Sequence, residues 1–465
     1  MEDIVSFCVE LARKKGASYA EARFERDETD GAMLKNGTLE ATELSKGSGI
    51  GVRVLVNGCM GFASSSAVSR KSASDAVDDA IKLAHVSRAA PIELSPFKGE
   101  NRKWESKERI KSRDIGIEEK ISLLKDMENA IKSPSVPIRF LQISFQNNEK
   151  VYANSEGALL TSKVPRIEFH YNIVVRHGGE TENRYSQWGK SGGYELLRDW
   201  DMEEKINSES KALLQCLKKP LNIPKGKTDV LISPEIVGIA CHESSGHPGE
   251  GDRILGREGS QAGESYLGFE WVGKRIGSDC VTVVDDPTLE NSLGFYLYDD
   301  EGVMARRRFL IKNGMISEFL HNRQSSVAFG TESNASARAS GYNLEPLVRM
   351  ANTFMLPGKH SFDELLEGIK KGVLMKSFTE WNIDDRRWNQ KYTGSECYLI
   401  ENGEIKGAVR RPVLELTTKS FYSSIDACSK DLEFFAGNCG KGDPMQGAPV
   451  WLGGPYARMR GVTLA

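Results

Sequence analysis

Two histidines and a glutamate stand close together in the stretch GIACHESSGHPGEGD, residues 238–252. His242 and His247 are of a type that binds zinc, but five positions separate them, whereas a metal-binding helix usually sets its two histidines four residues apart. Five residues of regular α-helix turn by about 500°, so the two side chains would point roughly 140° apart. The spacing therefore needs an explanation before the pair can be a metal site.

The residues next to His247 provide that explanation. A buried strand at residues 229–233 ends at Ser233, a good N-cap, so a helix is predicted to begin at Pro234. Pro248 cannot continue a regular helix, and Gly246 tolerates almost any backbone angle. We expect residues 245–247 to form a π-type bulge or a helix end. At a π-like pitch of about 4.4 residues per turn, His247 returns to within about 50° of the first histidine.

This arrangement predicts hydrolytic zinc chemistry. Zinc in a hydrolase takes three protein ligands and keeps one position for water, which the metal acidifies. Glu243, next to His242, is placed to accept the proton from that water and to deliver it to a leaving amine. The alternative is a buried helix end with two hydrogen-bonded histidines and a surface glutamate. The strand, the cap and the Gly-His-Pro break together favour the metal site.

The third zinc ligand is not selected by spacing. The carboxylate candidates that follow the motif are Glu250, Asp252, Glu258 and Glu264. The cysteine candidates are Cys241, Cys280, Cys397, Cys428 and Cys439. Cys241 points about 100° away from its neighbour His242 on a helix. The residues alone leave the choice among the others open.

The length of the chain, 465 residues, exceeds one ordinary core and predicts two domains. A linker with two prolines and a glycine, residues 218–229, sets the expected domains at 1–220 and 221–465. The chain has 62 Lys plus Arg and 65 Asp plus Glu, and this balance argues against a nucleic-acid or membrane-surface partner. An acidic start without a long apolar run and scattered cysteines predict a reduced, cytoplasmic protein.

The hydrophobic pattern predicts an α+β protein. Helix and strand signals alternate early in the chain, and a period-two pattern over residues 138–188 indicates an antiparallel meander. A charged helix is expected over residues 194–217 and another helix over residues 365–375. We therefore expect a mixed α/β N-terminal domain with an antiparallel sheet, followed by a β-rich C-terminal domain that carries the metal-site helix. The Asn-Gly pairs at residues 57–58, 313–314 and 402–403 predict hairpin turns.

Several motifs in the second half resemble those of one known family. They are HESSGHPGEGD, TVVDDPT, YDDEGV, ANTFMLPG, YLIENGEI and GNCGKGDPMQGAPVW. Their order and spacing from about residue 229 onward resemble the TldD branch of the TldD/PmbA (TldD/TldE) family of zinc metallopeptidases. The first 220 residues resemble the family more loosely, chiefly in GIGVRVLVNGCMGFAS, and the segment WNIDDRRWNQKYTG, residues 381–394, departs from many relatives.

The resemblance implies a ligand set and a mode of action. It implies that His242, His247 and Cys439 hold Zn²⁺, with Glu243 as the catalytic acid/base. It also implies pairing of two subunits, as a homodimer or as a heterodimer with a PmbA/TldE-like subunit, around short or unfolded peptides bound as extended strands.

Two competing functions remain beside the peptidase. One is a non-catalytic binding protein that modulates a DNA-handling enzyme, since the family has carried a gyrase-modulator label, and the other is a purely structural zinc site. Glu243 favours the peptidase, because a binding site has no use for a base beside its metal ligands. The acids at residues 285–286 and 299–301 are interpreted as turn acids rather than metal ligands.

Overall fold

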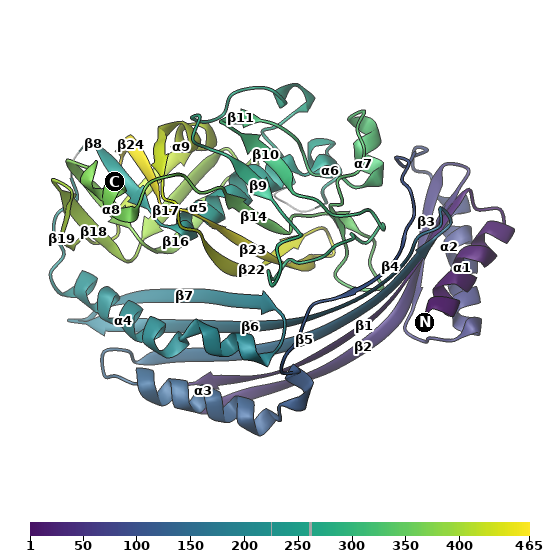
Figure 1. Ribbon diagram of the computed structural model, residues 1–465, viewed down its shortest axis with the longest axis horizontal. Coiled ribbons are helices and arrows are strands. Elements are labelled where there is room, and N and C mark those ends of the chain that lie inside the picture. The colour runs from purple at the N-terminus through teal and green to yellow at the C-terminus, as the bar shows by residue number, and fades with distance from the viewer. Residues whose placement is uncertain (225, 260–262) are drawn as a thin grey trace.

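The computed structural model describes residues 1–224, 226–259 and 263–465, so position 225 of the expected linker lies outside the described residues. A long curved sheet forms the N-terminal half, and the C-terminal half lies against its concave side (Figure 1). The predicted α+β class, with an antiparallel N-terminal sheet and a β-rich C-terminal half, is confirmed. No helix among the described residues is long and apolar enough to cross a lipid bilayer.

The N-terminal sheet has the strand order β3-β2-β1-β5-β6-β4, and β7 also pairs with β6. Its strands are β1 (Tyr19–Lys35), β2 (Thr38–Val56), β3 (Cys59–Ser65), β4 (Asn101–Glu105), β5 (Ile138–Asn154), β6 (Leu159–His177) and β7 (Glu180–Ser191). All neighbours are antiparallel except β4, which runs parallel to β6. The meander expected over residues 138–188 is the β5-β6-β7 part of this sheet.

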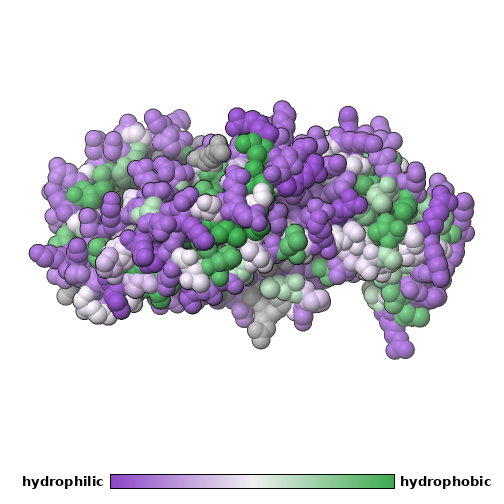
Figure 2. Space-filling model, turned by 90° about the horizontal axis from the view of Figure 1, so that it is seen from below, coloured by the Kyte–Doolittle hydropathy of each residue, from purple (hydrophilic) through white to green (hydrophobic). Residues whose placement is uncertain are grey.

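Four helices cover the outer face of the sheet in two pairs (Figure 1). They are α1 (Glu2–Lys14), α2 (Arg70–Val86), α3 (Ile117–Ile131) and α4 (Met202–Lys218), with short 3₁₀ turns at Ser112–Asp114 and Tyr194–Trp200. The first pair packs on one hydrophobic cluster and the second pair on another. The single helix expected over residues 194–217 is interrupted at Asp201, whose φ of 42° lies in the left-handed region. On the face seen from below, hydrophobic residues are interspersed among hydrophilic ones (Figure 2).

The C-terminal half consists mainly of strands. They are β8 (Lys227–Ile232), β9 (Val283–Asp285), β10 (Arg308–Lys312), β11 (Met315–Ile316), β12 (Ala337–Arg338), β13 (Leu347–Val348), β14 (Asn352–Met355), β15 (Lys371–Met375), β16 (Phe378–Ile383), β17 (Asn389–Gly394), β18 (Cys397–Glu401), β19 (Glu404–Ala408), β20 (Val413–Thr417), β21 (Ile425–Cys428), β22 (Glu433–Lys441), β23 (Gln446–Gly454) and β24 (Ala457–Thr463). They form two six-stranded sheets, β11-β10-β9-β14-β23-β22 and β19-β18-β15-β8-β24-β21, a three-stranded sheet β16-β17-β20 and the pair β12-β13.

Short helices connect these strands. They are α5 (Pro234–Cys241), η3 (His242–Gly246), η4 (His247–Gly249), α6 (Gly251–Ile254), η5 (Phe269–Trp271), α7 (Arg323–Ala328), α8 (Phe362–Glu367) and α9 (Thr418–Ser424). Helix α5 follows β8 directly, contacts β14, β22 and β23, and is buried along its whole length. It therefore holds its C-terminal end, where the histidines begin, in a fixed position against β22.

The Asn-Gly hairpins are confirmed, and one predicted helix is wrong. Both residues of each pair have the positive φ that a tight hairpin turn requires, for example 49° at Asn313 and 74° at Gly314. The helix expected over residues 365–375 ends at Glu367, and its second half, from Lys371 onward, is strand β15. Strand β15 pairs in parallel with β8 and is buried on both faces, so its apolar run does not alternate. Periodicity alone cannot distinguish such a run from a helix.

The acids at residues 285–286 and 299–301 are buried rather than solvated. Asp286, Asp299 and their neighbours do form turns, but Asp285 lies in β9 and pairs with Arg308. Glu301 accepts a hydrogen bond of 2.7 Å from Arg53 of β2, and Asp300 one of 2.9 Å from Lys150 of β5. These acids therefore connect the C-terminal half to the N-terminal sheet.

Candidate metal centre

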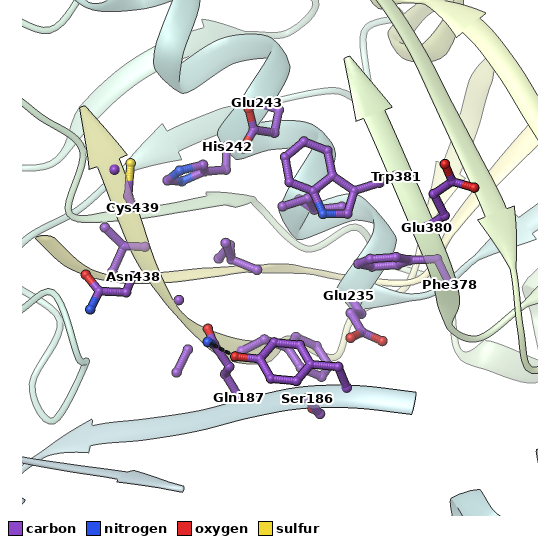
Figure 3. A pocket seen from close by; sticks show the side chains of 18 of the residues that line it. Ser186, Gln187, Glu235, His242, Glu243, Phe378, Glu380, Trp381, Asn438 and Cys439 are labelled. Carbon is purple, nitrogen blue, oxygen red and sulfur yellow. Dashed lines mark hydrogen bonds between the residues drawn. The ribbon is translucent and has the colours of Figure 1, made fainter. Parts of the chain in front are cut away.

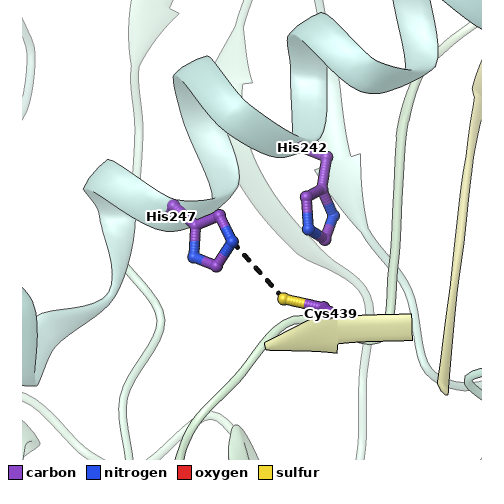
Figure 4. Close-up of side chains that lie close together, drawn as sticks. All are labelled: His242, His247 and Cys439. Atoms are coloured by element: carbon purple, nitrogen blue, oxygen red, sulfur yellow. Dashed lines mark hydrogen bonds between the residues drawn. The ribbon is translucent and has the colours of Figure 1, made fainter. Parts of the chain in front are cut away.

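The helix that carries the histidines changes its winding where the sequence predicted. Helix α5 ends at Cys241, a π-helical turn follows over His242–Gly246, and a 3₁₀ turn over His247–Gly249. A side chain at Gly246 would collide with Met350, since a Cβ atom there would lie 1.8 Å from its sulfur. The wider turn brings both imidazoles to one side, with ring centroids 5.0 Å apart (Figure 4). The predicted loosening of the last turn is confirmed.

Cys439 faces the two histidines from strand β22 (Figure 4). Its Sγ lies 3.4 Å from Nε2 of His247. One donor atom each from His242, His247 and Cys439 fall within 4.8 Å of one another, and all three residues are buried. Within the described ranges, this is the one group of three or more His, Cys, Asp or Glu side chains that converge closely enough to hold an ion.

The other third-ligand candidates lie elsewhere. Asp252 accepts a hydrogen bond of 2.7 Å from Lys441, and Glu264 is exposed on the surface beside Arg386. Glu258 lies within 3.5 Å of Lys441 and accepts a hydrogen bond from the backbone N–H of Gly442. The remaining cysteine candidates, Cys241, Cys280, Cys397 and Cys428, do not join the group. The structure thus brings together the three residues that the resemblance implied.

Glu250, also a candidate ligand, instead supports His247. Its Oε2 lies 3.1 Å from His247 Nδ1, the ring nitrogen that faces away from Cys439. Arg253 and Lys441 contact the same carboxylate at 3.1 and 3.3 Å. Although burial raises the pKa of Glu250, Lys441 and His247 hold it well below its usual value. A carboxylate on the far nitrogen of a ligand histidine fixes the ring and raises its basicity.

The local charges favour a thiolate. Burial raises the pKa of the Cys439 thiol, but His247, His242 and Arg349 together lower it well below its usual value. Burial lowers the pKa of His247, whereas the Cys439 thiolate and Glu250 raise it to about 9. The pair is therefore an imidazolium beside a thiolate near neutral pH, ready to exchange a proton for a cation.

These residues fit a zinc ion. Two imidazoles and a thiolate are a donor set that zinc prefers, and three protein ligands leave a fourth position open. Nδ1 of His242 is buried and has no hydrogen-bond partner in the described part of the chain. A supporting carboxylate is already in place on the other histidine.

Glu243 lies beside this group and lines the same cavity (Figure 3). The cavity has a volume of about 700 Å³, and residues of β7, α5, β16 and β22 form its walls. The carboxylate of Glu243 is paired with the guanidinium of Arg387, from the segment at residues 381–394. The sequence analysis missed Arg387. The feature that could have indicated it is the Asp-Asp-Arg-Arg run inside residues 381–394, the segment that departs from many relatives.

The edges of two sheets border the cavity. Strand β22 is the last strand of its six-stranded sheet and β16 the last strand of its three-stranded sheet. Asn438 and Cys439 of β22, Phe378 and Trp381 of β16, and Gln187 of β7 surround the same space (Figure 3). An extended chain placed there would lie alongside the edge strand that carries Cys439.

Known proteins are similar to this chain over nearly its whole length. The family model for the PmbA/TldA metallopeptidase C-terminal domain matches residues 225–465, and models for domain 1 and the central domain match residues 20–84 and 110–214. A metalloprotease of Methanocaldococcus jannaschii is 31% identical over 445 residues, which cover 95% of each chain. A zinc metalloprotease TldD homolog of Saccharolobus solfataricus is 28% identical and covers 97% of each chain.

A solved structure shares the fold. A protein of Thermotoga maritima superposes with a TM-score of 0.80 at 19% identity and covers 100% of both chains. The family models and the relatives extend across both halves of the molecule described above. The chain therefore belongs to the PmbA/TldD family of metallopeptidases.

Proposed function

We propose that this protein hydrolyses peptide bonds with a zinc ion held by His242, His247 and Cys439 and with Glu243 as general acid and base. The observation that carries the proposal is the convergence of these three donors with a buried carboxylate in one cavity. When bound, zinc supplies a Lewis acid that polarises the peptide carbonyl and acidifies water. Glu243 takes the proton from that water and transfers it to the leaving amine.

The substrate is proposed to be a short or unfolded peptide in extended form. Because β22 ends its sheet, its outer backbone groups can pair with an added strand, and such pairing tolerates many sequences. The same strand carries Cys439, so a peptide paired with it would run past the metal. Aromatic side chains of β16, Phe378 and Trp381, provide apolar contact from the opposite wall.

The proposed setting is the cytoplasm, with two subunits enclosing the cavity. All eight cysteines are free thiols in the structure, which supports a reducing compartment. The second subunit is either another copy of this chain or a PmbA/TldE-like subunit. The mass of the purified protein in solution, alone and after co-expression with such a subunit, distinguishes the two.

Two other functions are tested by the same experiment. The Thermotoga protein is described as a candidate modulator of a DNA gyrase, which suggests a non-catalytic binding role. A structural zinc site would need a fourth protein ligand, and none joins the group among the described residues. The test is metal analysis followed by peptide cleavage with and without a chelator. Zinc together with chelator-sensitive cleavage supports the peptidase, whereas zinc without cleavage contradicts it.

A further inference from the structure

One arginine enters the proposed active-site cavity. Arg387 lies between β16 and β17, and it is the one lysine or arginine among the described residues that line the cavity. Three acids line the same space: Glu243, Glu380 and Glu235, of which the last already pairs with Arg184 at 2.8 Å. Once a metal has displaced the proton of His247, Arg387 is therefore the one positively charged side chain among the described residues of the wall.

The loop around Arg387 holds this side chain in place. Arg387 has a φ of 64°, a left-handed backbone angle that a residue with a Cβ rarely adopts. Asp384 accepts hydrogen bonds from the backbone N–H groups of Trp388 and Asn389, and the Arg387 carbonyl accepts one from Thr418. Surrounding contacts thus enforce a disfavoured conformation, which is typical of functional sites.

The loop is also anchored by aromatic packing. The ring of Trp388 packs on Tyr266, with centroids 5.1 Å apart, and lies near Trp271. This packing fixes the residue directly after Arg387. The guanidinium is therefore presented from a rigid support rather than from a free surface loop.

The hydrogen-bonding capacity of the Arg387 guanidinium is largely unused. It has five N–H donors, and in the described part of the chain its recorded partner is the Glu243 carboxylate, through Nη1. Its Nε is buried without a hydrogen-bond partner, and a buried donor without a partner is costly. A guanidinium with free donors has the geometry to bind a carboxylate through two parallel hydrogen bonds.

The position of Arg387 identifies the part of the substrate that it faces. In the proposed function, on which this inference rests, Glu243 delivers a proton to the leaving amine. A group that contacts Glu243 therefore borders the half of the peptide that begins with that amine. We propose that Arg387 binds a carboxylate in this leaving half, so that the enzyme prefers peptides with a negative charge close after the cleaved bond.

That carboxylate has two sources. It is either the C-terminal α-carboxylate, which would make the enzyme act near peptide ends, or the side chain of an aspartate directly after the cleaved bond. The chemistry recognised by Arg387 is the same in both. The experiment therefore compares both kinds of peptide.

The test measures binding in the absence of hydrolysis. Zinc-loaded full-length Glu243→Gln protein is titrated calorimetrically with three peptides: Ala-Ala-Phe-Ala with a free carboxylate, the same peptide as its C-terminal amide, and Ala-Ala-Phe-Asp amide. The neutral glutamine also ensures that an effect of Arg387 is not caused by leaving the Glu243 charge without a partner. Wild-type kcat/KM values for the three peptides, with products identified by mass, complete the comparison.

We expect a charged peptide to bind about 10- to 100-fold more tightly than the neutral amide, the range for a charge-assisted hydrogen bond. Arg387→Met added to Glu243→Gln should abolish this preference, and Arg387→Lys should retain part of it. The matched control is the neighbouring Arg386→Met, because Arg386 is exposed and lies 3.7 Å from the exposed Glu264. This control should leave the preference intact. A preference for the free acid alone identifies the α-carboxylate, and a preference that includes the aspartate peptide identifies the side chain.

Three results would overturn the inference. They are equal binding of all three peptides, a preference that survives Arg387→Met, and an equal loss for charged and neutral peptides in that variant. The last result would indicate a structural or transition-state role for Arg387. If no peptide is hydrolysed by the wild type but the Arg387-dependent preference persists, the peptidase proposal fails and the carboxylate site stands.

Discussion

Two buried groups of titratable side chains differ in how their charges are satisfied. Where the two halves of the molecule meet, Arg53 lies 2.7 Å from both Glu21 and Glu301, so each charge has a partner inside the group. At the candidate metal centre, His242, His247 and Cys439 instead bring one donor atom each to within 4.8 Å of one another. A high density of titratable residues therefore does not identify a site. The convergence of metal-binding donor atoms on one point does.

The two groups also differ in their chemistry. The contact between the two halves, formed by Arg53, Glu21 and Glu301, uses carboxylates and a guanidinium group, whose charges neutralise each other. The metal centre uses imidazole and thiolate, which bind zinc well. If this distinction is correct, substitutions in the first group should lower stability and leave metal binding intact. Substitutions in the second group should weaken metal binding and lower stability only through the loss of the metal.

The largest expected effect is on catalysis. Glu243→Gln removes the proposed base but no metal ligand, so hydrolysis should fall by about 10²- to 10⁴-fold while zinc content stays at the wild-type level. Peptide-cleavage rates and metal analysis on the same preparation measure both. Glu380→Gln is the matched control, because Glu380 lines the same cavity from an exposed position. An active Glu243→Gln enzyme would remove Glu243 from the mechanism.

The second largest effect is expected on zinc affinity, when a metal ligand is removed. Cys439→Ala should lower zinc affinity by more than about 100-fold, the upper limit typical of losing a supporting residue. The metal-loaded protein should also melt at a lower temperature, because zinc joins β22 to the helix. Cys428→Ala provides the comparison, since Cys428 is buried beside Met355 and outside the metal group. Full zinc binding by Cys439→Ala would refute the ligand assignment.

A substitution at the contact between the two halves should lower stability without changing zinc binding. Arg53→Met leaves Glu21 and Glu301 buried without their shared cation, and breaking a buried ion pair costs about 3–5 kcal/mol. Denaturant unfolding of the zinc-loaded protein measures this loss. Zinc affinity should stay unchanged, because no residue of this group contacts the metal ligands. A large fall in zinc affinity would show that the two groups are coupled.

A smaller effect is expected at the residue that orients a ligand. Glu250→Gln keeps the shape of the side chain but removes the charge beside His247 Nδ1. Zinc affinity should fall by about 10- to 100-fold, as for other residues that support a ligand histidine. Titration against a competing chelator measures this change, and Glu264→Gln on the surface should have no effect. If Glu250→Gln bound zinc normally, the His247 ring would be fixed by its other contacts.

The same two groups differ in how much of each could be predicted from the sequence. The winding of the chain at His242 and His247 depends on Gly246 and Pro248, which are local, so the π-turn could be foreseen. Cys439 could not be chosen from the residues alone, because strand pairing between distant segments brings it to the helix. The resemblance to a family supplied that ligand before the structure did.

The features that the sequence analysis missed depend on tertiary contacts. The strand at β15 was expected to be helical because burial on both faces removes the alternation of a strand. The acids at residues 299–301 were interpreted as turn acids, and their contacts with Arg53 and Lys150 were missed because those partners lie far away in sequence. Arg387 was missed for the same reason, since its role depends on the loop that turns it toward Glu243. The domain limits at residues 1–220 and 221–465 stay a prediction.

The last prediction concerns protons, and its effect per pH unit is the smallest. Burial lowers the pKa of His247, but the Cys439 thiolate and Glu250 raise it to about 9. Despite burial, the two histidines and Arg349 hold the pKa of Cys439 well below its usual value. At neutral pH the thiol has thus already lost its proton, while His247 keeps one that zinc must displace. Apparent zinc affinity should therefore rise by about tenfold per pH unit below pH 9 and level off above it. About one proton should be released per zinc bound at pH 7, which calorimetry in buffers of different ionisation enthalpy measures.

In Glu250→Gln the pH at which zinc affinity levels off should be lower, because one of the two anions that hold the proton on His247 is gone. A zinc affinity that does not change between pH 7 and 9 would mean that His247 is already neutral at pH 7. The metal centre would then hold no proton for zinc to displace, and the chemical difference between it and the ion-pair group around Arg53 would be smaller than we propose.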